Sequence, residues 1–396
     1  MVGRGGALGV SYSTTEKRDC IIQRARRLLL RKTSARLVLA SYRAGMWEAG
    51  IWFVFSKRFA MKATTTATRY LFVLILSASF AALPPHALAQ SCESGPDLDA
   101  ATKSAIEGAA QRYFSMSVQG DVAGLKANAI PPVAANFRGI EQAVVDNKKY
   151  FAEGQPAITA TYLLDASQSK GTLERADFYC GIYNSSQRVG FSIPNLPAGK
   201  YAVVIQTVSG DKDPITLTMI LQDVGGGSWK LAGYYPRLTS IGGHDGQWYL
   251  TQARQYKAKN QLHDAWFYYL TAWDLLAPVN FMGNPQLDKI ADEMQTVRPG
   301  DLPSEQFPLA LSANGKVFKI TELAPVPVAN ELNLRVRYQS ADASNTALAF
   351  QDNMAVIKAV VAKYPEVREA FTAVIARAVD NAGHDYGSLL AIKDVK

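Results

Sequence analysis

The sequence predicts an α+β fold, because helical periodicity comes first, strand alternation follows, and both patterns return further along the chain. Asp99 is the expected N-cap of a first helix, in which Ile106, Tyr113 and Phe114 lie on one face. Two shorter helices are expected over 122–129 and 140–151. The alternation that follows predicts five strands, at 158–164, 178–183, 201–208, 215–224 and 229–235.

The composition is that of a globular protein. The chain has 396 residues, of which 48% are hydrophobic and 19% are charged. These values exclude the disordered, collagen-like and low-complexity classes. The length favours two or three domains.

The formal net charge of +8 belongs to the start of the chain. Residues 1–60 hold 12 Lys and Arg against 3 Asp and Glu, and the chain after residue 89 is slightly acidic. A slightly acidic body has no general attraction for phosphate backbones. We therefore expect no nucleic-acid partner.

Residues 61–89 have the parts of a secretory signal peptide. Lys62 and Arg69 precede an apolar run over 71–83, and Ala87-Leu88-Ala89 supplies a cleavage site. The apolar run is shorter than the ~20 residues that a membrane span requires. We expect a periplasmic or secreted protein that starts at Gln90 and has no transmembrane segment after cleavage.

Residues 1–60 are rich in Arg and poor in acids. Because a signal peptide stands at the start of its protein, we interpret these residues as upstream sequence and Met61 as the true start. A transit-type extension is the alternative.

Cys92 and Cys180 are the two cysteines after the predicted cleavage site. An even pair in an exported protein predicts one disulfide. Lipidation of Cys92 is the competing possibility, and it would make the protein a lipid-anchored envelope component.

Tyr113-Phe114, Gly120-Asp121, Leu125 and the closing strand 228–235 resemble the NTF2-like (cystatin-like roll) superfamily. The resemblance covers about 97–240 and suggests a first domain at 90–245. It implies a curved antiparallel sheet that wraps a long helix. The segment 184–198 is expected as a loop longer than the usual hairpin loop of that family, and we interpret it as an insertion.

The same resemblance implies a pocket on the concave face of the sheet. Its expected lining is Tyr113, Tyr162, Asp165, Val203 and Trp229. The ligand would be a small apolar molecule or an unknown protein. Some members of the superfamily are isomerases or lyases, and Asp165 or Asp177 would then have to be buried as a base.

Residues 246–298 are similar to one tetratricopeptide helix pair, through Ala253, Tyr256, Ala265, Tyr269 and Ala272. A single repeat cannot bury its own apolar face. We therefore expect a helical hairpin docked on a neighbour, and the consecutive aromatic residues 266–269 fit that role.

Residues 299–396 are expected to form a ββαββ module. Its predicted strands lie at 317–323, 331–338, 371–379 and 388–395, and its helix at 350–364. The module resembles no family known to us.

The motifs of common enzymes are absent: the chain has no H-E-x-x-H, G-x-S-x-G or C-x-x-C sequence. Two Gly-His-Asp triplets, at 243–245 and 383–385, are interpreted as turns. We assign no catalytic residue, metal or cofactor. The leading hypothesis is a non-enzymatic envelope protein that binds or scaffolds; the alternative is an isomerase or lyase that uses the cone. The sequence does not predict the oligomeric state.

Overall fold

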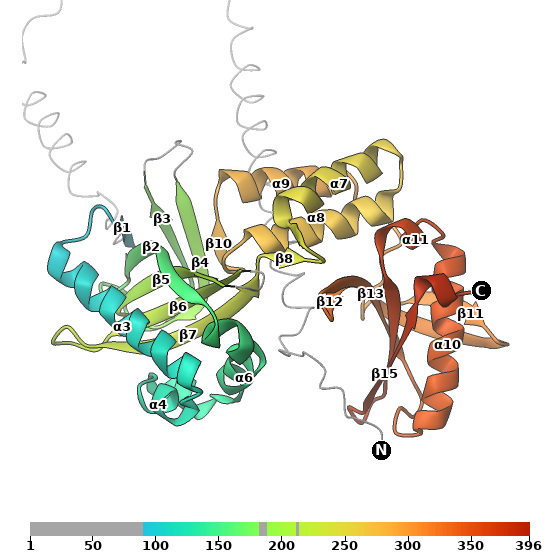
Figure 1. The fold of residues 1–396 in the computed structure, drawn as a ribbon, viewed down its shortest axis with the longest axis horizontal. Coiled ribbons are helices and arrows are strands. Elements are labelled where there is room, and N and C mark those ends of the chain that lie inside the picture. Colours follow the sequence, from blue (N-terminus) through green and yellow to red (C-terminus); the bar gives the residue numbers. More distant parts are fainter. Residues whose placement is uncertain (1–89, 182–187, 211–213) are drawn as a thin grey trace, which may run out of the picture. The chain divides into compact units, whose positions relative to one another are not determined.

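The computed structural model describes residues 90–181, 188–210 and 214–396, and it is an α+β protein with several antiparallel sheets (Figure 1). The α+β prediction is confirmed. The predicted signal peptide at 61–89 and the extension at 1–60 lie outside the described residues. Within the described ranges, no helix combines the length and the apolar character that a membrane crossing needs.

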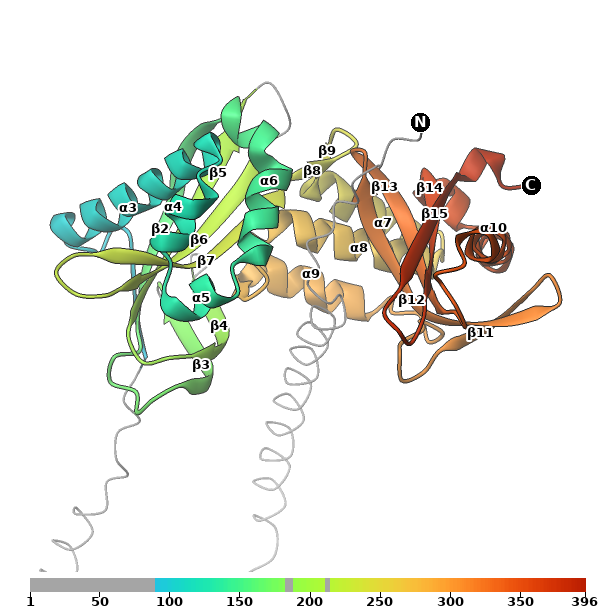
Figure 2. The same ribbon diagram turned by 90° about the horizontal axis from the view of Figure 1, so that it is seen from below.

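The first part of the fold is a five-stranded antiparallel sheet covered on one face by helices. Its strands, in sheet order, are β1 (Ser91–Ser94), β2 (Gln155–Asp165), β5 (Lys200–Ser209), β6 (Ile215–Asp223) and β7 (Trp229–Leu238). Its helices are α3 (Ala100–Gln119), α4 (Val122–Ala127), α5 (Pro131–Ala135) and α6 (Arg138–Ala152). Helices α3 and α6 pack on the same face of the sheet (Figures 1 and 2).

Local signals in the sequence define the ends of α3. The carboxylate of Asp99 accepts a hydrogen bond from the Thr102 backbone N–H at 2.9 Å, as expected of an N-cap. The helix ends at Gly120, whose φ of 72° is the left-handed conformation that favours glycine. Asp121 then caps α4 by accepting from Gly124 N–H.

A second, three-stranded sheet covers the opposite face of the first. Its strands are β10 (Met282–Gly283), β4 (Val189–Leu196) and β3 (Leu173–Cys180). The expectation of a loop over 184–198 is therefore wrong for the part that forms β4. Pro194 and Asn195, whose φ is 51°, interrupt the alternation that would have revealed this strand.

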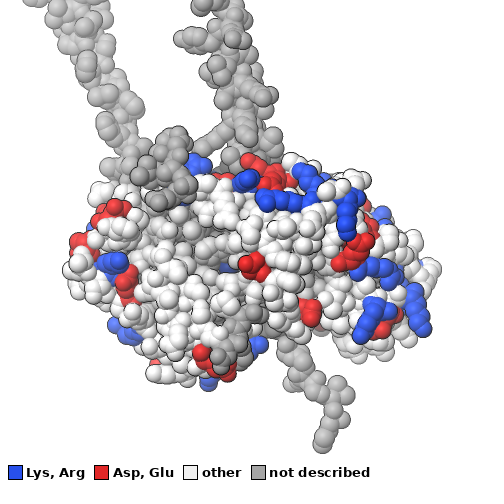
Figure 3. All heavy atoms as spheres, turned by 45° about the horizontal axis from the view of Figure 1, so that its top comes forward, with Lys and Arg blue, Asp and Glu red and all other residues white. Residues whose placement is uncertain are grey.

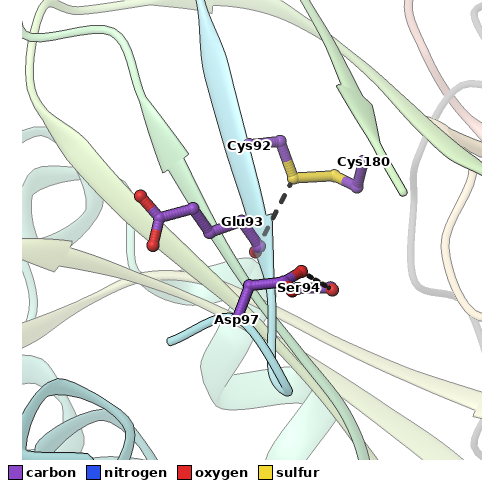
Figure 4. Close-up of a disulfide and its surroundings, with 5 residues drawn as sticks. All are labelled: Cys92, Glu93, Ser94, Asp97 and Cys180. Carbon is purple, nitrogen blue, oxygen red and sulfur yellow. Dashed lines mark hydrogen bonds between the residues drawn. A yellow bond between two sulfur atoms is a disulfide. The ribbon is translucent and has the colours of Figure 1, made fainter. Parts of the chain in front are cut away.

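The predicted disulfide is present and joins these two sheets (Figure 4). Cys92 on β1 is bonded to Cys180 on β3, and their Cα atoms are 5.1 Å apart. The bond closes a separation of 88 residues in the sequence.

The remainder of the chain holds a helical hairpin and a second five-stranded sheet. The short strands β8 (Ser240–Ile241) and β9 (His244–Asp245) lead into the helices α7 (Gly246–Ala258), α8 (Leu262–Leu276) and α9 (Pro285–Gln295). The sheet contains β11 (Leu309–Ala313), β12 (Lys316–Val328), β13 (Glu331–Gln339), β14 (Ala373–Val379) and β15 (Asp385–Ala391). Helices α10 (Thr346–Lys363) and α11 (Val367–Ala370) connect the parallel strands β13 and β14.

The helical hairpin and the C-terminal sheet share one hydrophobic core. The rings of Phe267 on α8 and Phe371 before β14 meet at 5.8 Å. The Tyr256 hydroxyl donates to the Glu369 carbonyl oxygen at 3.1 Å. The hairpin therefore packs on its neighbour and does not stand alone.

Arg237 connects the first sheet to the hairpin. Its side chain, on β7, is 13% exposed, and its guanidinium donates to the carbonyl oxygens of Asp274 and Ala277, both at 3.1 Å. It also pairs with the Asp274 carboxylate at 3.6 Å. Because buried charges require partners, this pairing holds the end of α8 against β7.

Candidate functional site

The structure distributes the five expected ligand residues over two faces of one sheet. Tyr113 and Trp229 are buried under α3, where the Tyr113 hydroxyl donates to the Trp229 carbonyl oxygen at 2.7 Å. Val203 and Tyr162 pack on the opposite face, against the three-stranded sheet. Asp165 lies at the end of β2. These five side chains do not meet around one cavity.

The two carboxylates considered as bases are tied to neighbours. Asp165 accepts from the backbone N–H of Ser167 at 2.8 Å and lies 3.8 Å from the Lys200 ammonium. Partial burial raises the pKa of Asp165, but the Ser167 bonds and the Lys200 charge outweigh it and the net pKa is lowered. Asp177 accepts from the Arg175 guanidinium. Asp165 therefore lacks the raised pKa that a base near neutral pH requires, and Asp177 is engaged by an arginine.

A cavity of about 260 Å³ lies elsewhere, where the helical hairpin meets the C-terminal sheet. It is lined by five aromatic rings, two acids and four other residues: His244, Trp248, Tyr249, Tyr268, Phe371, Glu331, Glu369, Gly242, Leu332, Ala370 and Thr372. These residues come from three stretches of chain, at 242–268, 331–332 and 369–372.

Two tight turns build one wall of this cavity. Gly242 and Gly243, with φ of 61° and 74°, form the turn between β8 and β9 and adopt a conformation that favours glycine. The Gly242 N–H donates to the Asn330 carbonyl oxygen at 2.8 Å, in the turn between β12 and β13. The side chain of Asp245 then caps α7 by accepting from the Trp248 N–H at 2.8 Å. This cap fixes Trp248 in the first turn of the helix.

The aromatic rings of the cavity are packed against one another. The His244 ring stacks on Trp248 with centroids 3.7 Å apart and planes within 7°. Trp248 meets Tyr249 at 5.0 Å and 85°, and Tyr249 meets Tyr268 at 5.2 Å and 57°. Inclined rings of this kind form walls rather than a flat stack.

Backbone carbonyls hold the two tyrosines in place. The Tyr249 hydroxyl donates to the Ile241 carbonyl oxygen at 3.1 Å, and the Tyr268 hydroxyl donates to the Ala370 carbonyl oxygen at 2.7 Å. Burial, together with the charge of Glu331, raises the pKa of Tyr249 to about 12. Burial also raises the pKa of Tyr268 above its ordinary value. Both hydroxyls therefore remain protonated donors at neutral pH.

The two acids of the cavity differ in their partners. Glu369 accepts from the Lys259 ammonium at 3.0 Å, so its charge is offset. Glu331 accepts from the neutral hydroxyl of Thr372 at 2.9 Å. The lining contains no Lys or Arg. The cavity therefore has a net negative charge, supplied by Glu331.

A second group of titratable side chains lies where α8 begins. The His263 ring nitrogens are 2.8 Å from the Asp301 carboxylate and 3.0 Å from the Glu366 carboxylate. Asp264 is fully buried, and neither carboxylate oxygen has a hydrogen-bond partner within the described ranges. Burial, then the nearby charges of Glu366 and Glu369, raise the pKa of Asp264 to about 7.

No group of three or more His, Cys, Asp and Glu side chains in the described part of the chain is arranged to hold a metal ion. On the face that Figure 3 shows, Lys and Arg lie beside Asp and Glu. The absence of a nucleic-acid partner stays a prediction.

The sequence predicts both Gly-His-Asp triplets in turns, and this is confirmed only in part: Gly243 lies in a turn, whereas His244 and Asp245 form β9 and Asp385 begins β15. His384 follows Gly383, whose φ is 86°, and its ring bonds to the Asp380 carboxylate at 2.8 Å. What that reasoning missed is that His244 also lines a cavity. The available signal was the glycine pair at 242–243, which stands a few residues before Trp248 and Tyr249.

The comparisons with known proteins add nothing to this geometry. No protein-family model, no curated protein and no solved structure matches the chain. The resemblances to NTF2-like and tetratricopeptide folds stay predictions, and the chemistry of the site has to be derived from its own residues.

Proposed function

We propose that this is an exported, non-enzymatic binding protein of the cell envelope whose ligand occupies the cavity between the helical hairpin and the C-terminal sheet. The single observation that carries the proposal is the built character of the cavity. Its rings are fixed by the Asp245 cap and by hydroxyl bonds to backbone carbonyls. A preformed site loses little conformational entropy when a ligand enters.

Export is supported by the disulfide, because such bonds persist mainly in oxidising compartments. The sequence of residues 61–89 favours the same location. A lipid anchor on Cys92 is disfavoured, since its Sγ atom is already bonded to Cys180 and a thioether would need the same atom.

A binding role is favoured over isomerase or lyase chemistry. The tyrosines of the cavity have raised pKa values and hold their protons at neutral pH. Asp165, the base suggested for the cone, has a lowered pKa and is paired with Lys200. A general base works best when its pKa is near the working pH. Asp264 has such a pKa, but it does not line the cavity.

The test is a cavity-filling variant. Thr372 lines the cavity with an exposed side chain, so Thr372→Trp adds a bulky ring inside it. Ser312→Trp, at an exposed position of β11, is the matched control. The full-length exported protein would be screened by ligand-observed NMR against a panel of small cations, neutral molecules and anions.

We expect compounds that bind the wild type and Ser312→Trp but not Thr372→Trp. Binding that survives in Thr372→Trp would place the ligand elsewhere. A panel from which nothing binds the wild type would also count against the proposal.

A further inference from the structure

We propose that the face of the C-terminal sheet opposite α10 binds an acidic polypeptide segment, whose carboxylates pair with Arg337 and whose apolar side chains rest on Ile375 and Leu389. None of these three residues lines the cavity between the hairpin and the sheet. The inference therefore goes beyond the proposed function and does not depend on it.

Helix α10 covers one face of the C-terminal sheet (Figure 1). Val336 and Tyr338 on β13 belong to the core on that side, and the Tyr338 hydroxyl donates to the Asn353 side chain of α10 at 2.9 Å. Successive residues of a strand point to opposite faces of the sheet. Arg335 and Arg337, which alternate with these core residues, therefore lie on the other face.

The strand register places a third arginine beside them. Arg377 on β14 is the direct neighbour of Arg337 on β13, and Ile375 is the neighbour of Arg335. The side chains of Arg337 and Arg377 are 31% and 34% exposed, so a partner can reach both. We call this surface the arginine face; its charged members are Lys319, Glu322, Arg335, Arg337, Arg377 and Asp385.

The arginine face carries more positive than negative side chains. Four of its six charged members are basic, although the chain after residue 89 is slightly acidic as a whole. Asp385 accepts two hydrogen bonds from Arg377, at 2.9 and 2.6 Å, so this arginine is paired. Glu322 is shared between two arginines, because it accepts from Arg335 at 3.0 Å and also lies 4.0 Å from the Arg337 guanidinium.

Arg337 is therefore the arginine whose charge is offset least. In the described part of the chain its guanidinium donates no hydrogen bond, and its ion pair with Glu322 is long. Like charges in opposite positions of a sheet repel each other, so Arg377 adds to the positive potential at Arg337. A further carboxylate would satisfy this position, since guanidinium groups bind carboxylates through paired planar contacts.

The apolar neighbours indicate that this carboxylate belongs to a polypeptide. Ile375 lies two residues from Arg377 on the same face, and Leu389 of β15, which is 52% exposed, is the neighbour of Ile375. Same-face residues of a strand are ~6.6–6.8 Å apart, and so are alternate side chains of an extended peptide. An extended segment with an acidic residue at one position and an apolar residue two positions on matches both contacts. Small molecules, by contrast, prefer concave pockets.

The experiment measures peptide binding to the full-length exported protein by fluorescence anisotropy. The probe is a labelled synthetic peptide in which Glu and Leu alternate at every second position, with Ser between them. The control peptide has Gln in place of each Glu. The protein variants are Arg337→Gln, Arg337→Lys and Leu389→Ser. Arg138→Gln, at an exposed arginine of α6, is the matched charge control.

We expect the Glu peptide to bind at least about tenfold more tightly than the Gln peptide at low salt, and added salt to reduce this difference. Arg337→Gln should weaken binding of the Glu peptide about fivefold, the scale of one partly exposed ion pair. Arg337→Lys should weaken it less, because it keeps the charge but not the planar guanidinium. Leu389→Ser should weaken it about threefold, and Arg138→Gln should leave it unchanged. Unchanged melting temperatures would show that the variants remain folded.

Four results would overturn the inference. Equal binding of the Glu and Gln peptides would show that charge does not select the partner. Equal losses in Arg138→Gln and Arg337→Gln would show that the peptide has no fixed site on the arginine face. Vesicles of phosphatidylglycerol that bind through Arg337 while both peptides fail would identify an anionic membrane as the partner. A dimer that Arg337→Gln dissociates, again with no peptide bound, would identify a second copy of this chain. All four results leave the proposed function of the cavity untouched.

Discussion

Asp264 is an ionisable residue whose surroundings oppose its negative charge. It lies in the first turn of α8 among aromatic neighbours, fully buried, and its carboxylate oxygens have no hydrogen-bond partner in the described part of the chain. Burying an unpaired carboxylate is costly unless the group takes up a proton. Two further acids, Glu366 and Glu369, oppose its ionisation, and Lys259 favours it. The folded state therefore holds this side chain in its protonated form more readily than the unfolded chain does.

This raised pKa predicts a pH-dependent stability. The unfolded group ionises near its ordinary value of 3.8 and the folded group near 7, so the folded state binds more protons between these values. Stability contributed by this group is complete below about pH 4 and is lost as the pH rises to about 7. Asp264→Asn cannot ionise, so the variant should be more stable than the wild type at pH 8, by on the order of 2–4 kcal/mol.

Urea unfolding at pH 4, 6 and 8 measures this difference. The advantage of Asp264→Asn should shrink toward pH 4, while Glu305→Gln, at an exposed acid, should follow the wild type at each pH. A variant that is equally stabilised or destabilised at every pH would show that the carboxyl group does not titrate across this range.

Elements with a clear hydrophobic period could be predicted from the sequence, and short or interrupted ones could not. The strands β5, β6 and β7 are apolar runs of nine or ten residues, and their predicted bounds differ from the observed ones by a few residues. The strands β1 and β11 have only 4 and 5 residues. A pattern that short does not stand out from its surroundings, because four or five residues are the lower limit at which alternation identifies a strand.

The candidate site could not be predicted for a different reason. Its walls come from the β8–β9 turn, from α7 and α8, and from two segments of the C-terminal sheet region. Each segment has an ordinary local role as a turn, a helix start or a strand end. Their convergence depends on how the hairpin packs on β12 and α11, which no local period encodes.

Gly246 shows how closely the helices α7 and α8 of the hairpin approach each other. A Cβ atom built on this first residue of α7 would lie 2.6 Å from the Leu276 Cγ atom and 3.0 Å from the Ala272 carbonyl oxygen of α8. Contacts this short force the helices apart. We expect Gly246→Ala to destabilise the protein by about 1–3 kcal/mol, as other overpacked sites do.

Gly108 is the matched control, because it lies within α3 and nothing would stand within 4 Å of its added Cβ. Gly108→Ala should stabilise the protein by about 0.5–1 kcal/mol through helix propensity. Chemical unfolding measures both effects: the free energy of unfolding should fall in Gly246→Ala and rise in Gly108→Ala. Equal effects would mean that glycine flexibility, rather than helix approach, determines the result at position 246.

For the whole molecule, the disulfide is a covalent link between strands of two different sheets. It fastens β1, an edge strand of four residues, to β3 in the other sheet. Cys92→Ser/Cys180→Ser should lower the free energy of unfolding by about 2–5 kcal/mol, since the open chain regains the entropy of an 88-residue loop.

Hydrogen exchange would locate that loss. The amides of β1 and β3 should exchange faster in the double variant, while those of β13 and β14, which belong to a separate core, should keep their wild-type protection. Uniformly faster exchange would indicate that the bond supports the entire fold rather than the two sheets that it joins.

The helical hairpin and the C-terminal sheet share one hydrophobic core. We therefore expect the fold to survive a break in the chain between them. Residues 305–308 are exposed, and the Phe307 side chain is 78% exposed. Pro308 protects the bond after Phe307 from chymotrypsin-like proteases, but the exposed Glu305–Gln306 bond is open to a protease that cleaves after glutamate. Such a nick would divide α7–α9 from β11–β15, yet the apolar surfaces buried between them would still hold the fragments together. Two polypeptides made separately on either side of this turn would then be expected to find each other and rebuild the cavity by fragment complementation.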